Sequence, residues 1–170
     1  GVLDTSRFKF HLAEALGYSV QDVSSSVLGG HGDDMVALLR HTTISGIPLE
    51  DMIRMKKITR KKVNEIVNRI RTCGGEIITY MGTSAYYSPA ASAIEMVECY
   101  LRDQKKILPC SAYLRGQYGV KGIYVGVPVV LGANGAEKIV EINLKKDEKK
   151  EFIKSVNSVS DVLKVAKKLI

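Results

Sequence analysis

His31 lies in the stretch from Val27 to Asp34, where a short apolar run is followed by glycines at positions 29, 30 and 32. Glycines let the backbone turn sharply and let another group approach it closely. A histidine side chain can take up or release a proton near neutral pH. The stretch therefore fits a proton-transfer site, and equally a plain turn in which His31 ends a strand.

Asp4 and Arg7 stand three residues apart on a predicted helix from Leu3 to Leu16, so they share one face of it. Such a pair is often an ordinary surface ion pair worth a few tenths of a kcal/mol. Alternatively, each charge has its own partner. In that case the carboxylate orients an imidazole, and the guanidinium holds an anionic substrate through two parallel hydrogen bonds.

Together, the segments Leu3-Asp4-x-x-Arg7-Phe8 and Gly29-Gly30-His31-Gly32-Asp33 strongly resemble the lactate/malate dehydrogenase family. The resemblance runs from the first residue nearly to the C-terminus, and it covers the substrate-binding half of that family. It implies that His31 donates and accepts the proton and that Asp4 is its partner. Arg7 is then the group that binds the carboxylate of a 2-hydroxy or 2-oxo acid.

The resemblance implies NAD as the cofactor, bound mainly by an N-terminal Rossmann domain. No G-x-G-x-x-G segment lies between a predicted strand and helix, so we expect that domain to be absent from this chain. Residues 1–170 are then a single C-terminal catalytic, substrate-binding domain. We expect this domain to be inactive in isolation.

The choice of acid is predicted from Ser84 and Ala85, which by resemblance border the substrate pocket. Animal-type lactate dehydrogenases carry a threonine at the position that matches Ala85, and alanine leaves more room for the second carboxylate of oxaloacetate. The chain is most similar to the bacterial, lactate-dehydrogenase-like malate branch of the family. We therefore expect reversible NAD-dependent oxidation of (S)-malate to oxaloacetate, a reaction of the tricarboxylic acid cycle, with L-lactate as the alternative substrate.

A non-catalytic anion-binding or subunit-interaction module is the alternative from another class of function. It explains the net charge of +7 but gives no reason for an aspartate, an arginine and a histidine in this arrangement. Acidic residues interleave with the basic clusters, and no aromatic residues are spaced among them to stack on bases. We therefore expect the basic residues to lie on solvated helix faces, and we expect no nucleic-acid partner. The family is oligomeric, which implies a homo-oligomer, either a dimer or a tetramer.

A length of 170 residues with 45% hydrophobic content predicts one compact domain. The apolar runs are too short to span a bilayer, so we expect no membrane partner. Cys73, Cys99 and Cys110 are odd in number and show no metal-ligand spacing. We therefore expect no metal site, reduced thiols and a cytoplasmic location.

The hydrophobic periodicity predicts an α+β fold in which an antiparallel sheet is packed with long helices. Predicted helices span residues 3–16, 59–81, 90–103 and 147–170, and predicted strands span residues 21–30, 35–43, 107–114, 124–131 and 136–144. We expect Thr59, Ser88 and Asp147 to cap three of the helices, Gly17 to end the first, and the last helix to pack on the sheet. The short gap between the first two strands predicts a hairpin, and Asn134-Gly135 is a hairpin signal between the last two. Gly74-Gly75 is expected to mark a bend or a close helix contact.

Overall fold

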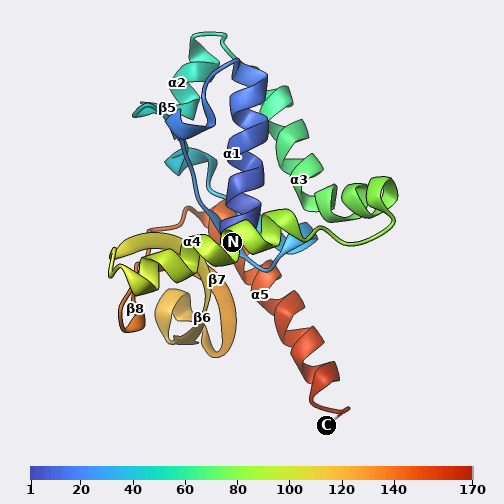
Figure 1. The fold of residues 1–170 in the computed structure, drawn as a ribbon, viewed down its shortest axis with the longest axis vertical. Helices are drawn as coiled ribbons and strands as arrows, with labels where there is room; N and C mark the ends of the chain where they lie inside the picture. Colours follow the sequence, from blue (N-terminus) through green and yellow to red (C-terminus); the bar gives the residue numbers. More distant parts are fainter. Residues whose placement is uncertain (170) are drawn as a thin grey trace.

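The computed structural model describes residues 1–169 (Figure 1). The α-helices are α1 (Val2–Leu16), α2 (Leu49–Arg54), α3 (Arg60–Met81), α4 (Tyr87–Leu101) and α5 (Lys146–Ala166). The strands are β1 (Val23–Ser24), β2 (Val27–Gly29), β3 (Met35–Ala37), β4 (Thr43–Ile44), β5 (Ile47–Pro48), β6 (Lys106–Arg115), β7 (Lys121–Gly132) and β8 (Gly135–Ile139). The predicted α+β class is confirmed.

The larger sheet has the strand order β3-β2-β7-β6, and β8 adds to it by pairing with β7. All of its pairings are antiparallel, as predicted. Gly132 of β7 pairs directly with Gly135 of β8, so Ala133-Asn134 makes the two-residue turn between them, one residue before the Asn134-Gly135 pair. Helix α5 packs against β3, β2 and β7, which confirms that the last helix covers the sheet.

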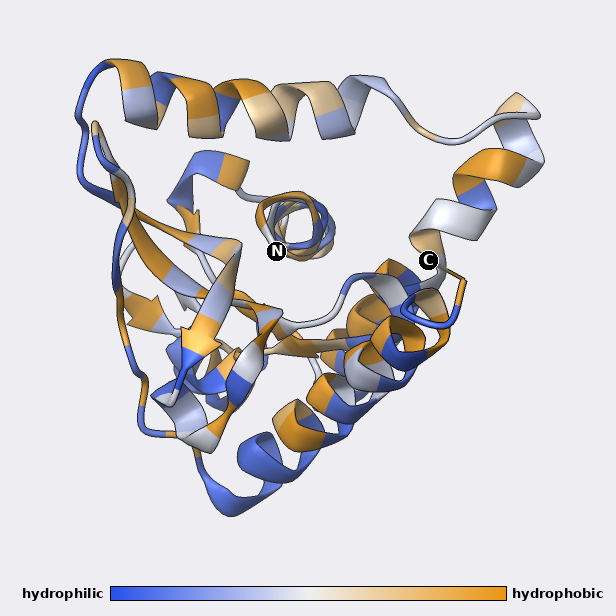
Figure 2. Ribbon diagram, turned by 90° about the horizontal axis from the view of Figure 1, so that it is seen from below, coloured by the Kyte–Doolittle hydropathy of each residue, from blue (hydrophilic) through white to orange (hydrophobic). Residues whose placement is uncertain are grey.

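Two hydrophobic cores meet at α1. Val2 belongs to the core between the larger sheet and α5, which contains Phe152. Phe8 and Leu12 belong to the second core, which α1 forms with α3 and the small sheet β1-β4-β5. Figure 2 looks along α1 and shows the other elements arranged around it. Asp4 and Thr5, which lie between Val2 and Phe8, are therefore buried.

The sequence predicted α1 and α3 closely. Gly17 ends α1 in the left-handed conformation, with φ of 72°. Thr59 caps α3, since its Oγ1 accepts the Lys62 N–H at 3.1 Å. At Gly74-Gly75 a Cβ would have no atom within 4 Å from any other element of residues 1–169, so the alternative of a close helix contact is wrong. Figure 1 shows that α3 instead changes direction towards its end.

The predicted starts of the last two helices need correction. Helix α4 begins at Tyr87, so Ser88 lies inside its first turn and is not the cap. Helix α5 begins at Lys146, and the Glu148 carboxylate accepts the Lys145 N–H at 2.7 Å. This bond back to Lys145 makes Lys145 the N-cap of α5, two residues before the predicted cap, Asp147. The prediction for Ile170 lies outside the described residues.

The two predicted strands over residues 21–30 and 35–43 are each divided between the two sheets. The segment 21–30 contains β1 of the small sheet and β2 of the larger sheet. Likewise, β3 is followed by a 3₁₀ turn and then by β4. The predicted hairpin between them is confirmed, because β2 pairs with β3. When a segment leaves one sheet and joins another, its apolar residues continue through the connection between the two strands. The periodicity of the sequence therefore does not show where one strand ends and the next begins.

Strands β6, β7 and β8 differ from prediction only at their ends, whereas β5 and helix α2 were not predicted. Strand β8 stops at Ile139, whereas the prediction continued to residue 144. Across residues 1–169, none of the helices combines the length and the apolar character needed to cross a membrane.

Candidate active site

Asp4 and His31 form a hydrogen-bonded pair between α1 and the loop after β2. The His31 Nδ1–H donates to Asp4 Oδ2 at 2.8 Å. Asp4 is fully buried, whereas the His31 side chain is 63% exposed. An ionised carboxylate only accepts hydrogen bonds, so the shared proton sits on Nδ1 and leaves Nε2 open on the exposed side. This is the tautomer that a proton-accepting histidine needs.

Arg7 lies on the other side of the same carboxylate. Its Nη1 is 4.0 Å from Asp4 Oδ1, which is beyond hydrogen-bond distance, and its side chain is 11% exposed. Asp4 Oδ1 is buried and has no hydrogen-bond partner among residues 1–169. The alternative of an ordinary surface pair is therefore wrong. One buried carboxylate stands between an imidazole and a guanidinium, and it bonds only the imidazole.

Other groups approach the backbone next to His31 so closely that two positions there have no room for a side chain. Gly29 has φ of +87°, and a Cβ on it would stand 2.3 Å from Ser155 Oγ. Gly126, which pairs with Gly29 across β2 and β7, has no room either, because its Cβ would lie 2.5 Å from the Gly29 carbonyl oxygen. The expectation that another group comes close to this backbone is confirmed.

Two serines of α5 hold the loop, and sequence reasoning missed them. The Gly30 N–H donates to Ser155 Oγ at 2.7 Å, and Ser158 Oγ donates to Asp34 Oδ2 at 2.6 Å. These partners are more than 120 residues apart, so no local spacing pattern predicts the contacts. The only sequence signal is a serine within the apolar stripe of α5.

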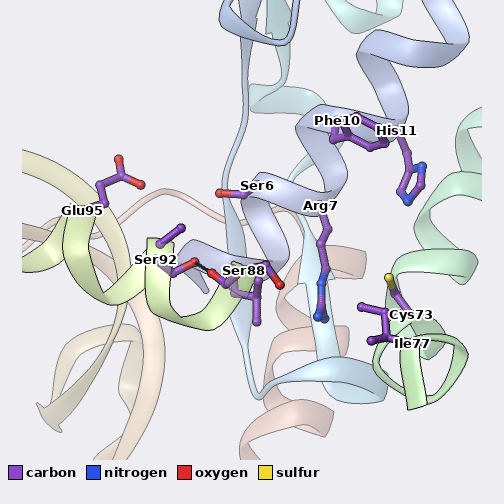
Figure 3. Close-up of a pocket in the computed structure, with 11 residues that line it drawn as sticks. Ser6, Arg7, Phe10, His11, Cys73, Ile77, Ser88, Ser92 and Glu95 are labelled. Atoms are coloured by element: carbon purple, nitrogen blue, oxygen red, sulfur yellow. Dashed lines mark hydrogen bonds between the residues drawn. The ribbon is translucent and has the colours of Figure 1, made fainter. Parts of the chain in front are cut away.

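Arg7 also lines a cavity of about 400 Å³ between α1, α3 and α4. Figure 3 shows its side chain extending from α1 alongside Cys73 and Ile77 of α3. The α4 side of the cavity includes Ser88 and Ser92. His11 and the Glu95 carboxylate also line the cavity, whereas Asp4 and His31 do not, so a small organic anion would be held there through Arg7.

Ser84 and Ala85 lie in the loop between α3 and α4, and they are not among the residues that line this cavity. Ser84 is exposed and Ala85 is half-buried. Among residues 1–169, no side-chain hydrogen bond joins either of them to Asp4 or His31. The structure therefore brings Asp4, Arg7 and His31 together, and it gives Ser84 and Ala85 no hydrogen bond to them among the described residues.

The other candidate groups have ordinary surroundings. His11 contacts the Glu14 carboxylate at 3.3 Å, and His41 is exposed in a 3₁₀ turn. All three cysteines are unpaired, and burial raises the pKa of the Cys110 thiol. Within residues 1–169, no group of three or more histidine, cysteine or acidic side chains is placed to hold a metal ion.

Comparison with known proteins identifies the family. The sequence model of the lactate/malate dehydrogenase α/β C-terminal domain matches residues 1–170. Malate dehydrogenase from Cryptosporidium parvum is 48% identical with a TM-score of 0.97, and the match covers 99% of this chain and 54% of that one. Malate dehydrogenase from Salinibacter ruber is 47% identical with a TM-score of 0.93, covering 99% and 54%.

A solved lactate dehydrogenase from Eimeria maxima, with NADH and oxamate, is also similar. It is 41% identical with a TM-score of 0.94, and the match covers 98% of this chain and 50% of that one. The chain thus spans about half the length of the solved structures that it matches. It belongs to the lactate/malate dehydrogenase family and corresponds to its C-terminal domain. The family consists of NAD-dependent 2-hydroxy-acid dehydrogenases.

Proposed function

We propose that this chain is the substrate-binding and proton-transferring part of an NAD-dependent malate dehydrogenase. The observation that carries the proposal is the buried Asp4 carboxylate, which bonds the exposed His31 ring at 2.8 Å and has the Arg7 guanidinium 4.0 Å away on its other side. A non-catalytic module has no use for a buried charge held in this way, since burying a carboxylate is costly.

The chemistry that these residues can perform is the oxidation of a 2-hydroxy acid and its reverse. His31 Nε2 accepts the proton of the substrate hydroxyl, and the Asp4 carboxylate stabilises the imidazolium that forms. Arg7 holds the substrate carboxylate through two parallel hydrogen bonds. Because Asp4 stands between both groups, a substrate held by Arg7 presents its hydroxyl on the side of His31.

The side chains at the site fit a reaction that also uses a nicotinamide cofactor. The His31 imidazole can move a proton and the Arg7 guanidinium can hold a carboxylate, but neither group can accept a hydride. NAD, when bound, supplies that acceptor. The sequence carries no glycine-rich phosphate-binding segment of the G-x-G-x-x-G type. In our proposal this chain therefore provides the substrate end of the site, and most of the cofactor is bound by an N-terminal domain.

Malate is proposed over lactate on the family resemblance at Ala85, which implies that its small side chain leaves room for a second carboxylate. Sequence identity does not separate the two substrates, because the similar malate dehydrogenases are 36% to 48% identical to the chain and the similar lactate dehydrogenases 41% to 43%. The second candidate, an L-lactate dehydrogenase, is supported by the TM-score of 0.94 to the lactate enzyme from Eimeria maxima.

We further propose that the protein is a homo-oligomer in the cytoplasm. The oligomer is supported by the apolar side chains that α4 exposes, among them Val97 and Leu101. The cytoplasmic location is supported by three unpaired cysteines. Sedimentation of the complete enzyme tests the first of these proposals, and localisation of a tagged copy tests the second.

The direct test is NADH oxidation by the complete enzyme with oxaloacetate and, separately, with pyruvate. We expect a higher kcat/KM with oxaloacetate. A preference for pyruvate would replace the malate assignment with lactate, and no oxidation with either acid would overturn the proposed activity. The 170-residue chain on its own is expected to show no saturable NADH oxidation.

A further inference from the structure

The loop that carries His31 is held from α5 on both sides of the histidine. On the N-terminal side, the Gly30 N–H donates to Ser155 Oγ at 2.7 Å. On the C-terminal side, the Asp34 carboxylate accepts the Ser158 hydroxyl at 2.6 Å. The two serines are three residues apart, so they lie on the same face of α5.

The contact between the loop and α5 leaves little freedom for movement. Ser155 is 2% exposed. A Cβ on Gly29 would stand 2.3 Å from Ser155 Oγ, and a Cβ on Gly30 would stand 3.2 Å from Val159 Cγ2. The adjacent side chains Phe152 and Val156 are buried in the core under the larger sheet, so this part of α5 is itself fixed.

The histidine is thus held by two different helices. Helix α5 bonds the Gly30 N–H on one side of it and the Asp34 side chain on the other, and Asp4 of α1 holds the ring through Nδ1. A ring with 63% of its side chain exposed has few packing contacts of its own to fix its direction. The direction of Nε2 therefore depends on a backbone that does not shift, because a displaced loop would carry the ring away from Asp4.

We propose that Ser155, and to a smaller extent Ser158, are positioning residues for His31. They keep the loop where the ring can bond Asp4 and direct Nε2 towards the substrate. The effect on turnover rests on the proposed function, whereas the effect on the ring does not. Ser158 contributes less because its bond joins two partly exposed side chains, whereas Ser155 is buried.

The test compares Ser155→Ala, Ser158→Ala and the matched control Ser160→Ala in the complete enzyme. Ser160 lies on the same helix and has no side-chain hydrogen bond within the part of the chain that the structure describes. We expect Ser155→Ala to lower kcat about ten- to a hundredfold, the scale of loss for a catalytic group displaced by about 1 Å. KM should change little because Arg7 is untouched, Ser158→Ala should show a smaller loss, and the control should show none.

A second readout reports the ring directly. The proton NMR signal of the His31 Nδ1–H should weaken in Ser155→Ala through exchange with water and persist in Ser160→Ala. A serine that only stabilised the fold would lower the free energy of unfolding and leave both kcat and this signal unchanged. That result would overturn the proposal. If the unsubstituted enzyme oxidises neither acid, the proposed function fails, and the NMR comparison still decides whether Ser155 positions the ring.

Discussion

Helices α1 and α4 are both 15 residues long, yet their surroundings are opposite. Helix α1 buries apolar side chains in both cores and carries a fully buried carboxylate. Helix α4 buries only Cys99 within the described part of the chain, and it exposes Ile94, Val97 and Leu101 by more than half of each side chain. The same length of helix thus packs into two cores in one case and lies at the surface in the other.

The residues predicted to perform the chemistry and the residues predicted to set the substrate specificity differ in the same way. Asp4 is held by the packing of α1, so the acid–imidazole pair is complete within this chain. Ser84 and Ala85 precede α4 on a loop and are less buried than Asp4, since Ser84 is exposed and Ala85 is half-buried. We therefore expect substitutions near α1 to have large effects on catalysis and stability, and substitutions near α4 to have smaller ones.

The largest effect is expected from His31→Gln. Removing the proton acceptor should lower kcat of the complete enzyme by about 10²- to 10⁴-fold, the usual contribution of a general acid–base group. Steady-state NADH oxidation measures it, and His41→Gln, an exposed histidine outside the site, is the matched control. Turnover close to that of the unsubstituted enzyme would remove His31 from its proposed role.

The contrast between the two helices predicts a difference in stability. Leu12→Ala should lower the free energy of unfolding by about 2 to 5 kcal/mol, because it leaves a cavity in a fully buried site. Ile94→Ala on α4 should change it by less than about 1 kcal/mol, because that side chain is 59% exposed. Urea denaturation of the chain measures both. Equal losses would show that α4 is packed as firmly as α1.

Arg7→Lys should mainly weaken substrate binding, because an ammonium cannot reproduce the planar two-point contact of a guanidinium. A loss on the order of 2 to 4 kcal/mol in kcat/KM is expected for a mostly buried charged contact. The control is Arg102→Lys on the exposed end of α4, which should leave kcat/KM unchanged. Unaltered kinetics in Arg7→Lys would exclude Arg7 as the carboxylate-binding group.

The smallest effect is expected from Ala85→Thr, which tests the specificity prediction. The added bulk should lower kcat/KM for oxaloacetate more than for pyruvate, by a difference on the order of 1 to 3 kcal/mol. The ratio of the two kcat/KM values is the measurement. An equal change for both acids would mean that the α3–α4 loop does not size the substrate at this residue.

Features that depend on neighbours in the chain could be predicted from the sequence. The glycine that ends α1, the threonine that caps α3 and the tight turn before Gly135 all act through contacts a few residues apart. The caps of α4 and α5 were each predicted two residues too late, because Tyr86 and Lys145, the observed N-cap residues, are not of the types that usually cap helices.

The sequence by itself determined the four long helices but not the short α2, the antiparallel hairpins and, through the resemblance, the three residues that meet at the site. Only the tertiary structure decided that Asp4 is fully buried, that it bonds His31 and leaves Arg7 free, and that Ser155 holds the loop. The reason is physical. Local pattern sets which face of a helix is apolar, whereas burial and distance between residues remote in the chain arise only when the two cores pack around α1.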